Sequence, residues 1–189
     1  MKRPPSRYAA SGSDDLSSGF LDLFYPIHYM VGIKIEDTLR CGVLTRQQAC
    51  ILWMIRTQGV DARVMRRKDI ERSLTGWFEV SSSAISKALR SLSRPPLNLV
   101  HITEAPGSGR EKVVELTPEG ERFLLQMIDN GRELMKWMLD HLTEKEANTG
   151  VDFLARVSEI FESANNGDDE GKPPTGQPPR RRSRGTSKP

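Results

Sequence analysis

Apolar residues recur with a helical period in the middle of the chain. Between residues 81 and 94 they fall at i, i+3, i+4 and i+7, at Ile85, Ala88, Leu89 and Leu92. This spacing predicts one apolar face on a helix of 3.6 residues per turn. Ser81 precedes the segment, where its hydroxyl can cap free backbone N–H groups. The pattern therefore predicts an amphipathic helix that ends near Arg94.

A shorter helix is predicted just before it, from about Arg67 to Leu74, with Ile70 and Leu74 facing the same core. Its exposed side carries cations, and the exposed side of the second helix carries hydroxyls and then cations. The pair resembles a helix-turn-helix, whose second helix enters the major groove of DNA. The alternative is an ordinary pair of amphipathic helices. The turn, residues 75–80, is longer than usual, and its Trp77 and Phe78 either plug the core or face DNA.

A β-hairpin is predicted after this pair. Pro95 and Pro96 end the second helix, and apolar residues then alternate over 99–103 and 112–116. A glycine-rich loop, residues 105–110, joins the two alternating runs, as is typical of a hairpin. A hairpin directly after a recognition helix is the wing of a winged helix, and its cationic tip suits contact with a DNA groove or backbone.

Further helices flank this central region. The first runs from Leu16 to Arg40, and Pro26 is expected to kink it or to start it afresh. Two more are predicted: one over 45–57, capped by Thr45 with Gln48, and one that begins at Thr117-Pro118, with Thr117 as the cap, and runs to about residue 142. The last, about 144–162, begins with a Thr143 and Glu146 capping box. It is predicted to bury Ala147, Val151, Leu154, Val157 and Phe161.

The composition predicts one folded domain between two polar tails. The chain has 189 residues, of which 37% are hydrophobic, enough for one compact core. Residues 1–15 and 165–189 are rich in Pro, Ser, Gly and charge, and we predict that both are disordered. The predicted fold, over 16–164, is mainly α with a small β-hairpin (α+β). It is a winged helix-turn-helix, with a DNA-binding lobe over about 44–117 and dimerisation helices on both sides.

Charge supports a nucleic-acid partner, because residues 61–112 hold ten Lys or Arg against six Asp or Glu, a net charge of +4. Cys41 and Cys50 are too few for a disulfide framework. The scattered histidines predict no metal site, and no motif of a catalytic or cofactor site is present. We therefore expect no enzyme and no cofactor. No apolar run is long enough to cross a membrane, and a cytoplasmic protein is the expectation.

Three segments in order resemble the MarR family of bacterial transcriptional regulators: VSSSAISKALRSL (80–92), Ser108-Gly109-Arg110 and VVELTPEG (113–120). The resemblance covers about residues 17–163. It implies a homodimer that binds a double-stranded, pseudo-palindromic operator in the bacterial cytoplasm, at the nucleoid, and acts as a repressor released by a small anionic aromatic effector. Ser108 stands where the family has an aspartate that braces the wing, and the long turn also departs from the family pattern.

The recognition helix, the first helix and the wing together supply the candidate DNA-binding residues. They are Arg66, Arg67, Lys68, Ser81, Ser82, Ser83, Ser86, Lys87, Arg90, Arg110 and Lys112. Base contacts are expected from Ser82, Ser83, Ser86 and Lys87, and phosphate contacts from the arginines and Lys68. The alternative is a winged-helix protein-interaction or assembly module without specific DNA binding.

Two further sets of residues follow from the resemblance. The predicted dimer interface comprises Phe20, Phe24, Ile27, Val31, Leu139, Leu142, Leu154 and Phe161. The candidate effector cleft comprises Tyr25, His28, Tyr29 and Trp53, for which plain packing of the first two helices is the alternative. Cys41 and Cys50 can form a redox switch, as in some members of that family. The alternative for Cys50 is inert packing.

Overall fold

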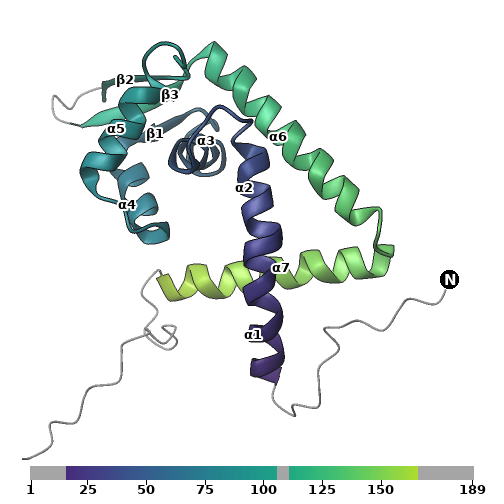
Figure 1. The fold of residues 1–189 in the computed structure, drawn as a ribbon. Coiled ribbons are helices and arrows are strands. Elements are labelled where there is room, and N and C mark those ends of the chain that lie inside the picture. The colour runs from purple at the N-terminus through teal and green to yellow at the C-terminus, as the bar shows by residue number, and fades with distance from the viewer. Residues whose placement is uncertain (1–15, 106–110, 166–189) are drawn as a thin grey trace, which may run out of the picture. The chain divides into compact units, whose positions relative to one another are not determined.

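The computed structural model describes residues 16–105 and 111–165, whose helices and strands are shown in Figure 1. The elements in chain order are α1 (Leu16–Ile27), η1 (His28–Gly32), α2 (Ile33–Leu39), α3 (Arg46–Gln58), β1 (Val64–Arg66), α4 (Arg67–Trp77), α5 (Ser82–Leu92), β2 (Val100–Glu104), β3 (Lys112–Leu116), α6 (Pro118–Leu139) and α7 (Glu144–Asn165). The chain divides into two compact units, Met1–Trp137 and Met138–Pro189. The predicted fold class is confirmed.

The predicted N-terminal helix is one helical run with a local change of winding. Pro26 lies inside α1, and the chain continues from Ile27 directly into η1, a π-helical turn, and then into α2. A proline inside a helix removes a backbone N–H and crowds the preceding turn. The π-helical turn begins two residues later, at His28. The helix therefore continues past Pro26 with a wider turn and does not start afresh.

Helix α3 has the boundaries that its caps predict. The Thr45 hydroxyl accepts the Gln48 N–H at 3.3 Å, and the Gln48 side chain accepts the Thr45 N–H at 2.8 Å. Gly59 ends the helix with an extended backbone. A Cβ at this position would lie 2.3 Å from the Ile55 carbonyl oxygen, so only glycine fits this close turn.

The sheet has one strand more than the predicted hairpin. β1 pairs antiparallel with β3, which also pairs with β2, so the strand order is β1-β3-β2. β1 has only three residues, too few to show alternation.

Helix α4 continues to Trp77, three residues beyond its predicted end. The connection to α5 is therefore Phe78–Ser81, shorter than the predicted 75–80.

The core of the first unit lies where the helix-turn-helix, α3 and the sheet meet. Ile70 and Leu74 of α4 are fully buried, and so are Ile85, Leu89 and Leu92 of α5. They pack in one cluster with Ile51, Leu52, Met54 and Ile55 of α3, Val114 and Leu116 of β3, and Leu124 and Met127 of α6. The apolar faces predicted for both helices of the pair are thus confirmed.

The segment Leu116–Gly120 connects β3 to α6 and hydrogen-bonds to the residues just before β2. The Thr117 hydroxyl donates to the Asn98 carbonyl at 2.7 Å and accepts the Gly120 N–H at 2.9 Å, so it caps α6 as predicted. Pro118 is the first helical residue, where its missing N–H costs nothing. A Cβ on Gly120 would lie 1.9 Å from the Leu99 carbonyl oxygen. The L-T-P-E-G sequence therefore combines a cap, a helix start and a close backbone contact.

The second unit holds one described helix, α7, which begins with the predicted capping box. Glu146 accepts the Thr143 N–H at 2.9 Å, and the Thr143 hydroxyl accepts the Glu146 N–H at 3.3 Å. The predicted burial of its apolar face is wrong for the single chain. Val151, Leu154 and Phe161 are exposed, and Ala147 and Val157 are half-buried. Within the described part of this unit, no second helix or strand is available to cover that face.

Candidate nucleic-acid interface

The N-terminus of α5 presents a group of hydroxyls. Ser81 caps the helix as predicted, because its Oγ accepts the Ala84 N–H at 3.3 Å. The same oxygen lies 2.8 Å from Ser83 Oγ. Ser82 and Ser83 are exposed, and so are Lys87 and Arg90 further along the helix. One face of α5 therefore carries hydroxyls followed by cations, and the opposite face is in the core.

Ser86 lies between these two groups and is held on two sides. Its hydroxyl donates to the Ser82 carbonyl oxygen at 2.8 Å and accepts from Arg67 Nη2 at 2.8 Å. Arg90 Nε donates to the Ser86 carbonyl at 3.3 Å. Arg67 is thus more than a free surface cation, because it joins the start of α4 to the middle of α5.

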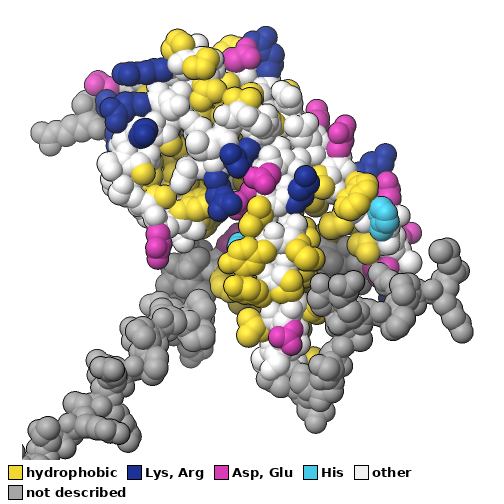
Figure 2. Space-filling view, in the orientation of Figure 1, with side chains coloured by type: hydrophobic (Ala, Val, Ile, Leu, Met, Phe, Trp, Pro, Cys, Tyr) yellow, Lys and Arg dark blue, Asp and Glu magenta, His cyan; other side chains and the backbone are white. Residues whose placement is uncertain are grey.

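Positively charged side chains line a hollow between α5 and the strands β2 and β3. It is lined by Arg67, Ser86, Leu89, Arg90, Ile102 and Lys112, from α4, α5, β2 and β3. These lining residues, all within the described chain, include three cations and no acid. In Figure 2, Lys and Arg side chains lie over the region of α5 and the wing strands. Cations from three elements around one hollow suit a phosphate of nucleic acid.

An acid at the base of the wing engages two of the predicted phosphate contacts. Glu111 lies 2.5 Å from Lys68 Nζ and 3.8 Å from Arg66 Nε. The hydrogen bond from Lys68, with the charge of Arg66 beside it, lowers the pKa of Glu111 below its ordinary value. Arg66 and Lys68 are therefore partly neutralised. Ser108 and Arg110, at the predicted tip of the wing, lie outside the described residues.

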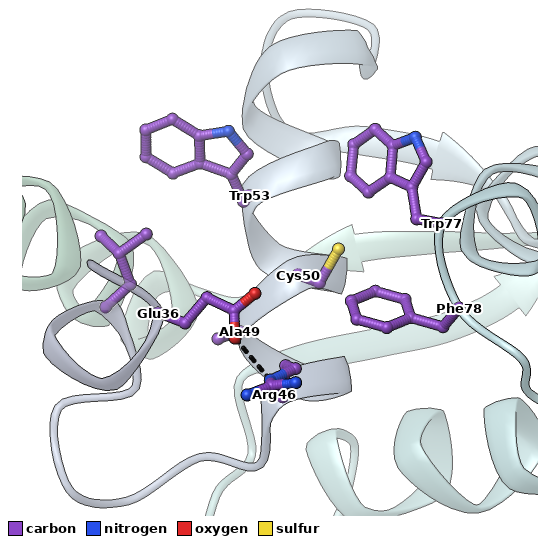
Figure 3. A pocket seen from close by; sticks show the side chains of 8 residues that line it. Glu36, Arg46, Ala49, Cys50, Trp53, Trp77 and Phe78 are labelled. Carbon is purple, nitrogen blue, oxygen red and sulfur yellow. Dashed lines mark ion pairs between the residues drawn. The ribbon is translucent and has the colours of Figure 1, made fainter. Parts of the chain in front are cut away.

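An apolar pocket lies on another side of the same unit. It is lined by Glu36, Leu39, Arg46, Ala49, Cys50, Trp53, Trp77 and Phe78, from α2, α3 and the end of α4. Figure 3 shows Trp53 and Trp77 on either side of Cys50, with the Glu36 and Arg46 ion pair below them. The Glu36 and Arg46 side chains lie 2.5 Å apart. Aromatic walls with a neutralised ion pair suit a flat ligand.

The predicted effector cleft is only partly brought together. On the first helical run, the ring of Tyr29 contacts that of Tyr25, with centroids 5.0 Å apart, and that of His28, with centroids 4.9 Å apart. They do not line the pocket that holds Trp53, because residues spaced i, i+3 and i+4 share a face of their own helix.

Trp77, a predicted core plug, is 55% exposed, whereas Phe78 packs against the core. The sequence placed Trp77 in the turn because α4 was predicted to end at Leu74, whereas Trp77 is the last residue of that helix.

Neither cysteine has the environment of a reactive thiol. Burial, with the charge of Glu36, raises the pKa of the Cys50 thiol to about 11. Burial also raises the pKa of Cys41, although a hydrogen bond from Asn130 to its sulfur at 3.3 Å opposes this. Reactive cysteines need a lowered pKa. The structure therefore favours inert packing for Cys50.

No group of three or more His, Cys, Asp or Glu among the described residues could hold a metal ion. The helices of the described chain include none that is long and apolar enough to cross a membrane.

Residues 44–120 match the winged helix DNA-binding domain family. This stretch, which runs from just before α3 into the first turn of α6, is therefore similar to a winged helix DNA-binding domain, and α5 is the second helix of its helix-turn-helix. No protein with a curated description matches the sequence.

Solved structures of transcriptional regulators resemble this chain over more than residues 44–120. A MarR-family transcriptional regulator from Rhodococcus sp. RHA1 is 19% identical, with a TM-score of 0.57 over 77% of this chain and 96% of that one. MepR, a regulator of the Staphylococcus aureus multidrug efflux pump MepA, is 20% identical, with a TM-score of 0.56 over 76% and 97%. Bordetella bronchiseptica BpsR is 19% identical, with a TM-score of 0.53 over 73% and 98%. The resemblance to MarR-family regulators is thus confirmed in the fold.

Proposed function

We propose that this chain is a dimeric, sequence-specific transcription regulator that represses its target genes and is released from DNA by a small ligand. The observation that carries the proposal is the face of α5 in a winged helix DNA-binding domain. Exposed hydroxyls and Lys87 lie on that face, and Arg67, Arg90 and Lys112 surround the adjoining hollow. Hydroxyls and a cation can contact base edges in the major groove, and the surrounding cations can bind the backbone.

Each candidate residue has a role in this proposal. Ser82, Ser83, Ser86 and Lys87 contact bases, Ser81 caps the helix beside them, and Arg67, Arg90, Arg110 and Lys112 bind phosphates. Arg66 and Lys68 bind phosphates after they exchange Glu111 for the DNA backbone, since an exposed ion pair is readily screened.

Homodimerisation is supported by the apolar surface of the flanking helices. Phe20, Phe24 and Ile27 of α1 are each more than two-fifths exposed, and Figure 2 shows hydrophobic side chains gathered along α1. Leu154 and Phe161 of α7 are more than half exposed, Leu139 and Leu142 are also exposed, and Val31 is half-buried. Apolar surface of this extent marks a protein contact. Two recognition helices in a dimer would meet half-sites about one helical turn apart, about 10 base pairs.

The effector would occupy the apolar pocket between α2, α3 and the end of α4. Its wall includes Trp77, the last residue of α4, so a bound ligand would touch the first helix of the helix-turn-helix. In BpsR, DNA binding is regulated by 6-hydroxynicotinic acid, a small aromatic acid. An anionic aromatic in the pocket of this chain would have to draw Arg46 away from Glu36, and a neutral aromatic would not.

The test is selection of bound duplexes from a random DNA library by the purified full-length protein at about physiological salt. We expect an inverted repeat whose half-sites lie about one helical turn apart. Purely salt-dependent binding without sequence enrichment, in the presence and absence of candidate aromatics, would contradict the proposal. It would favour the alternative, a winged-helix protein-interaction module.

A further inference from the structure

We propose that Ser86 contacts DNA as a hydrogen-bond acceptor only, with Arg67 as its positioning residue, so that it selects a base carrying an exocyclic amino group. This inference rests on the proposed function, because it concerns which base the recognition helix reads. In the major groove, such amino groups are N6 of adenine and N4 of cytosine.

The hydrogen-bonding capacity of a serine hydroxyl carries the argument. The group has one hydrogen to donate and two lone pairs to accept with. A carbonyl oxygen can only accept, so the hydrogen of Ser86 is directed at the Ser82 carbonyl, 2.8 Å away. A guanidinium can only donate, so one lone pair of Ser86 Oγ is occupied by Arg67 Nη2, also 2.8 Å away. One lone pair is left for a DNA base.

The two kinds of base contact then differ in the number of hydrogen bonds. A base amino group adds a bond to the open lone pair and disturbs neither existing bond. A base acceptor, such as guanine O6 or N7, needs the hydroxyl hydrogen, which must first leave the Ser82 carbonyl. The second contact exchanges one bond for another and gains little. A net hydrogen bond corresponds to roughly a two- to twelvefold difference in affinity.

Arg67 fixes this arrangement from outside the recognition helix. It belongs to α4, whereas Ser86 and Ser82 belong to α5. Arg67 also lines the hollow with Arg90 and Lys112, so its remaining N–H groups can bind a phosphate there while Nη2 holds Ser86. Arg67 therefore couples the position of the backbone to the orientation of the Ser86 hydroxyl.

The first experiment locates and then tests the base that Ser86 reads. Duplex selection with the full-length wild type and with Ser86→Ala identifies the position whose preference depends on Ser86. That variant should fold, because alanine is the best helix former. At this position the adenine is replaced by purine, or the cytosine by pyrimidin-2-one, each of which lacks the amino group. We expect wild-type affinity to fall roughly two- to twelvefold and Ser86→Ala affinity to stay unchanged.

A 7-deazapurine at the same base pair is the matched DNA control, since it removes the N7 acceptor and keeps the amino group. We expect it to leave wild-type affinity unchanged. Affinity lost on 7-deazapurine but kept on the base without the amino group would overturn the inference. So would a Ser86→Ala protein whose preference is altered at no position.

Two arginine variants test the positioning role. Arg67→Leu should reduce the discrimination between the bases with and without the amino group. Arg72→Leu, on the same helix but paired with Asp69, should leave that discrimination as in the wild type. Unchanged discrimination in folded Arg67→Leu, checked by circular dichroism, would remove Arg67 from this role. A wild type that selects no sequence would overturn the proposed function itself, whereas a selected sequence without the amino requirement would overturn only this inference.

Discussion

The DNA-binding lobe and the flanking helices carry similar apolar patterns with different outcomes. In the lobe, Leu74 of α4 and Ile85 of α5 are no more than 1% exposed. In the flanking helices, Phe24 of α1 is 44% exposed and Leu154 of α7 is 61% exposed. The difference shows that a helical period predicts an apolar face but not what covers it.

The physical reason is that burial depends on neighbours that the period does not describe. The helices of the lobe are joined by short connections to a sheet and to each other, so their apolar faces meet within a few tens of residues. For α1 and α7, the described residues close in sequence include no strand that could cover the apolar face, and several of their apolar side chains stay exposed. We expect a second copy of the chain to cover them. Leu74→Ala and Phe24→Asp test this contrast directly, and two further changes probe the pocket and the charged surface of the lobe.

The largest effect is expected from Leu74→Ala in the core of the lobe. Removing a fully buried leucine side chain loses its burial and leaves a cavity, at a cost of about 2–5 kcal/mol. Urea unfolding followed by circular dichroism measures the change. Arg72→Ala, on the same helix but with an exposed side chain, should cost far less. Equal losses in the two variants would show that the lobe is not packed as described.

The second change, Phe24→Asp, is directed at the flanking region. A charge in an apolar contact between two chains should dissociate the dimer, because the carboxylate would be buried without a partner. Sedimentation velocity over a range of concentrations measures the shift to monomer. Asp22→Lys, two residues away and therefore on roughly the opposite side of α1, should leave the dimer intact. A dimer that survives Phe24→Asp would place the interface elsewhere.

The third change concerns Cys50, in the pocket beside Trp53. Its folded-state pKa of about 11 exceeds the ordinary value of 9.0, so the folded protein holds this proton more tightly than the unfolded chain does. The contribution to stability is complete below pH 9 and is lost as the pH rises toward 11. Near pH 10 the loss is about tenfold in the folding equilibrium.

Comparison of wild type with Cys50→Ala measures this contribution, because other groups that titrate above pH 9 are common to both proteins. The free energy of unfolding of the wild type should fall more steeply between about pH 8 and 10. Parallel pH profiles for the two proteins would show that the Cys50 thiol ionises as freely in the folded state as in the unfolded one.

The smallest effect is expected from Glu111→Gln at the base of the wing. The change removes an acid from the candidate DNA surface and releases Lys68 and Arg66 for phosphates. DNA binding should strengthen severalfold at low salt, and the gain should shrink as salt screens the charges. Glu119→Gln, which removes an acid paired with Arg122 on α6, is the control. Weaker binding by Glu111→Gln would mean that the ion pairs of Glu111 position the wing for DNA.

Local signals account for the parts of the fold that could be predicted. The caps at Thr45, Ser81, Thr117 and Thr143 all depend on residues within three positions of one another, and all four form as predicted. The apolar face of α5 and the two wing strands, β2 and β3, also formed as their local patterns predict. The candidate base-contact residues were predicted in the same way, from the polar face of α5 opposite its apolar side.

The features that were missed depend on contacts between distant residues. β1 is only three residues long and is defined by its pairing with β3. The bond between Arg67 and Ser86 spans 19 positions, and Glu111 meets Lys68 from another element. The pocket joins Trp53 to Trp77, whereas the sequence suggested Tyr25 and Tyr29 as its partners.

Spacing along single elements was thus enough to predict the capped helix starts, the core face of the helix-turn-helix and the polar face of α5. Which polar groups engage one another became visible only in the folded chain. Packing holds Ser86 between Arg67 and the Ser82 carbonyl and pairs two cations of the candidate interface with Glu111. Hydrogen bonds and ion pairs need specific atoms within about 3–4 Å, and that proximity is set by how the elements pack.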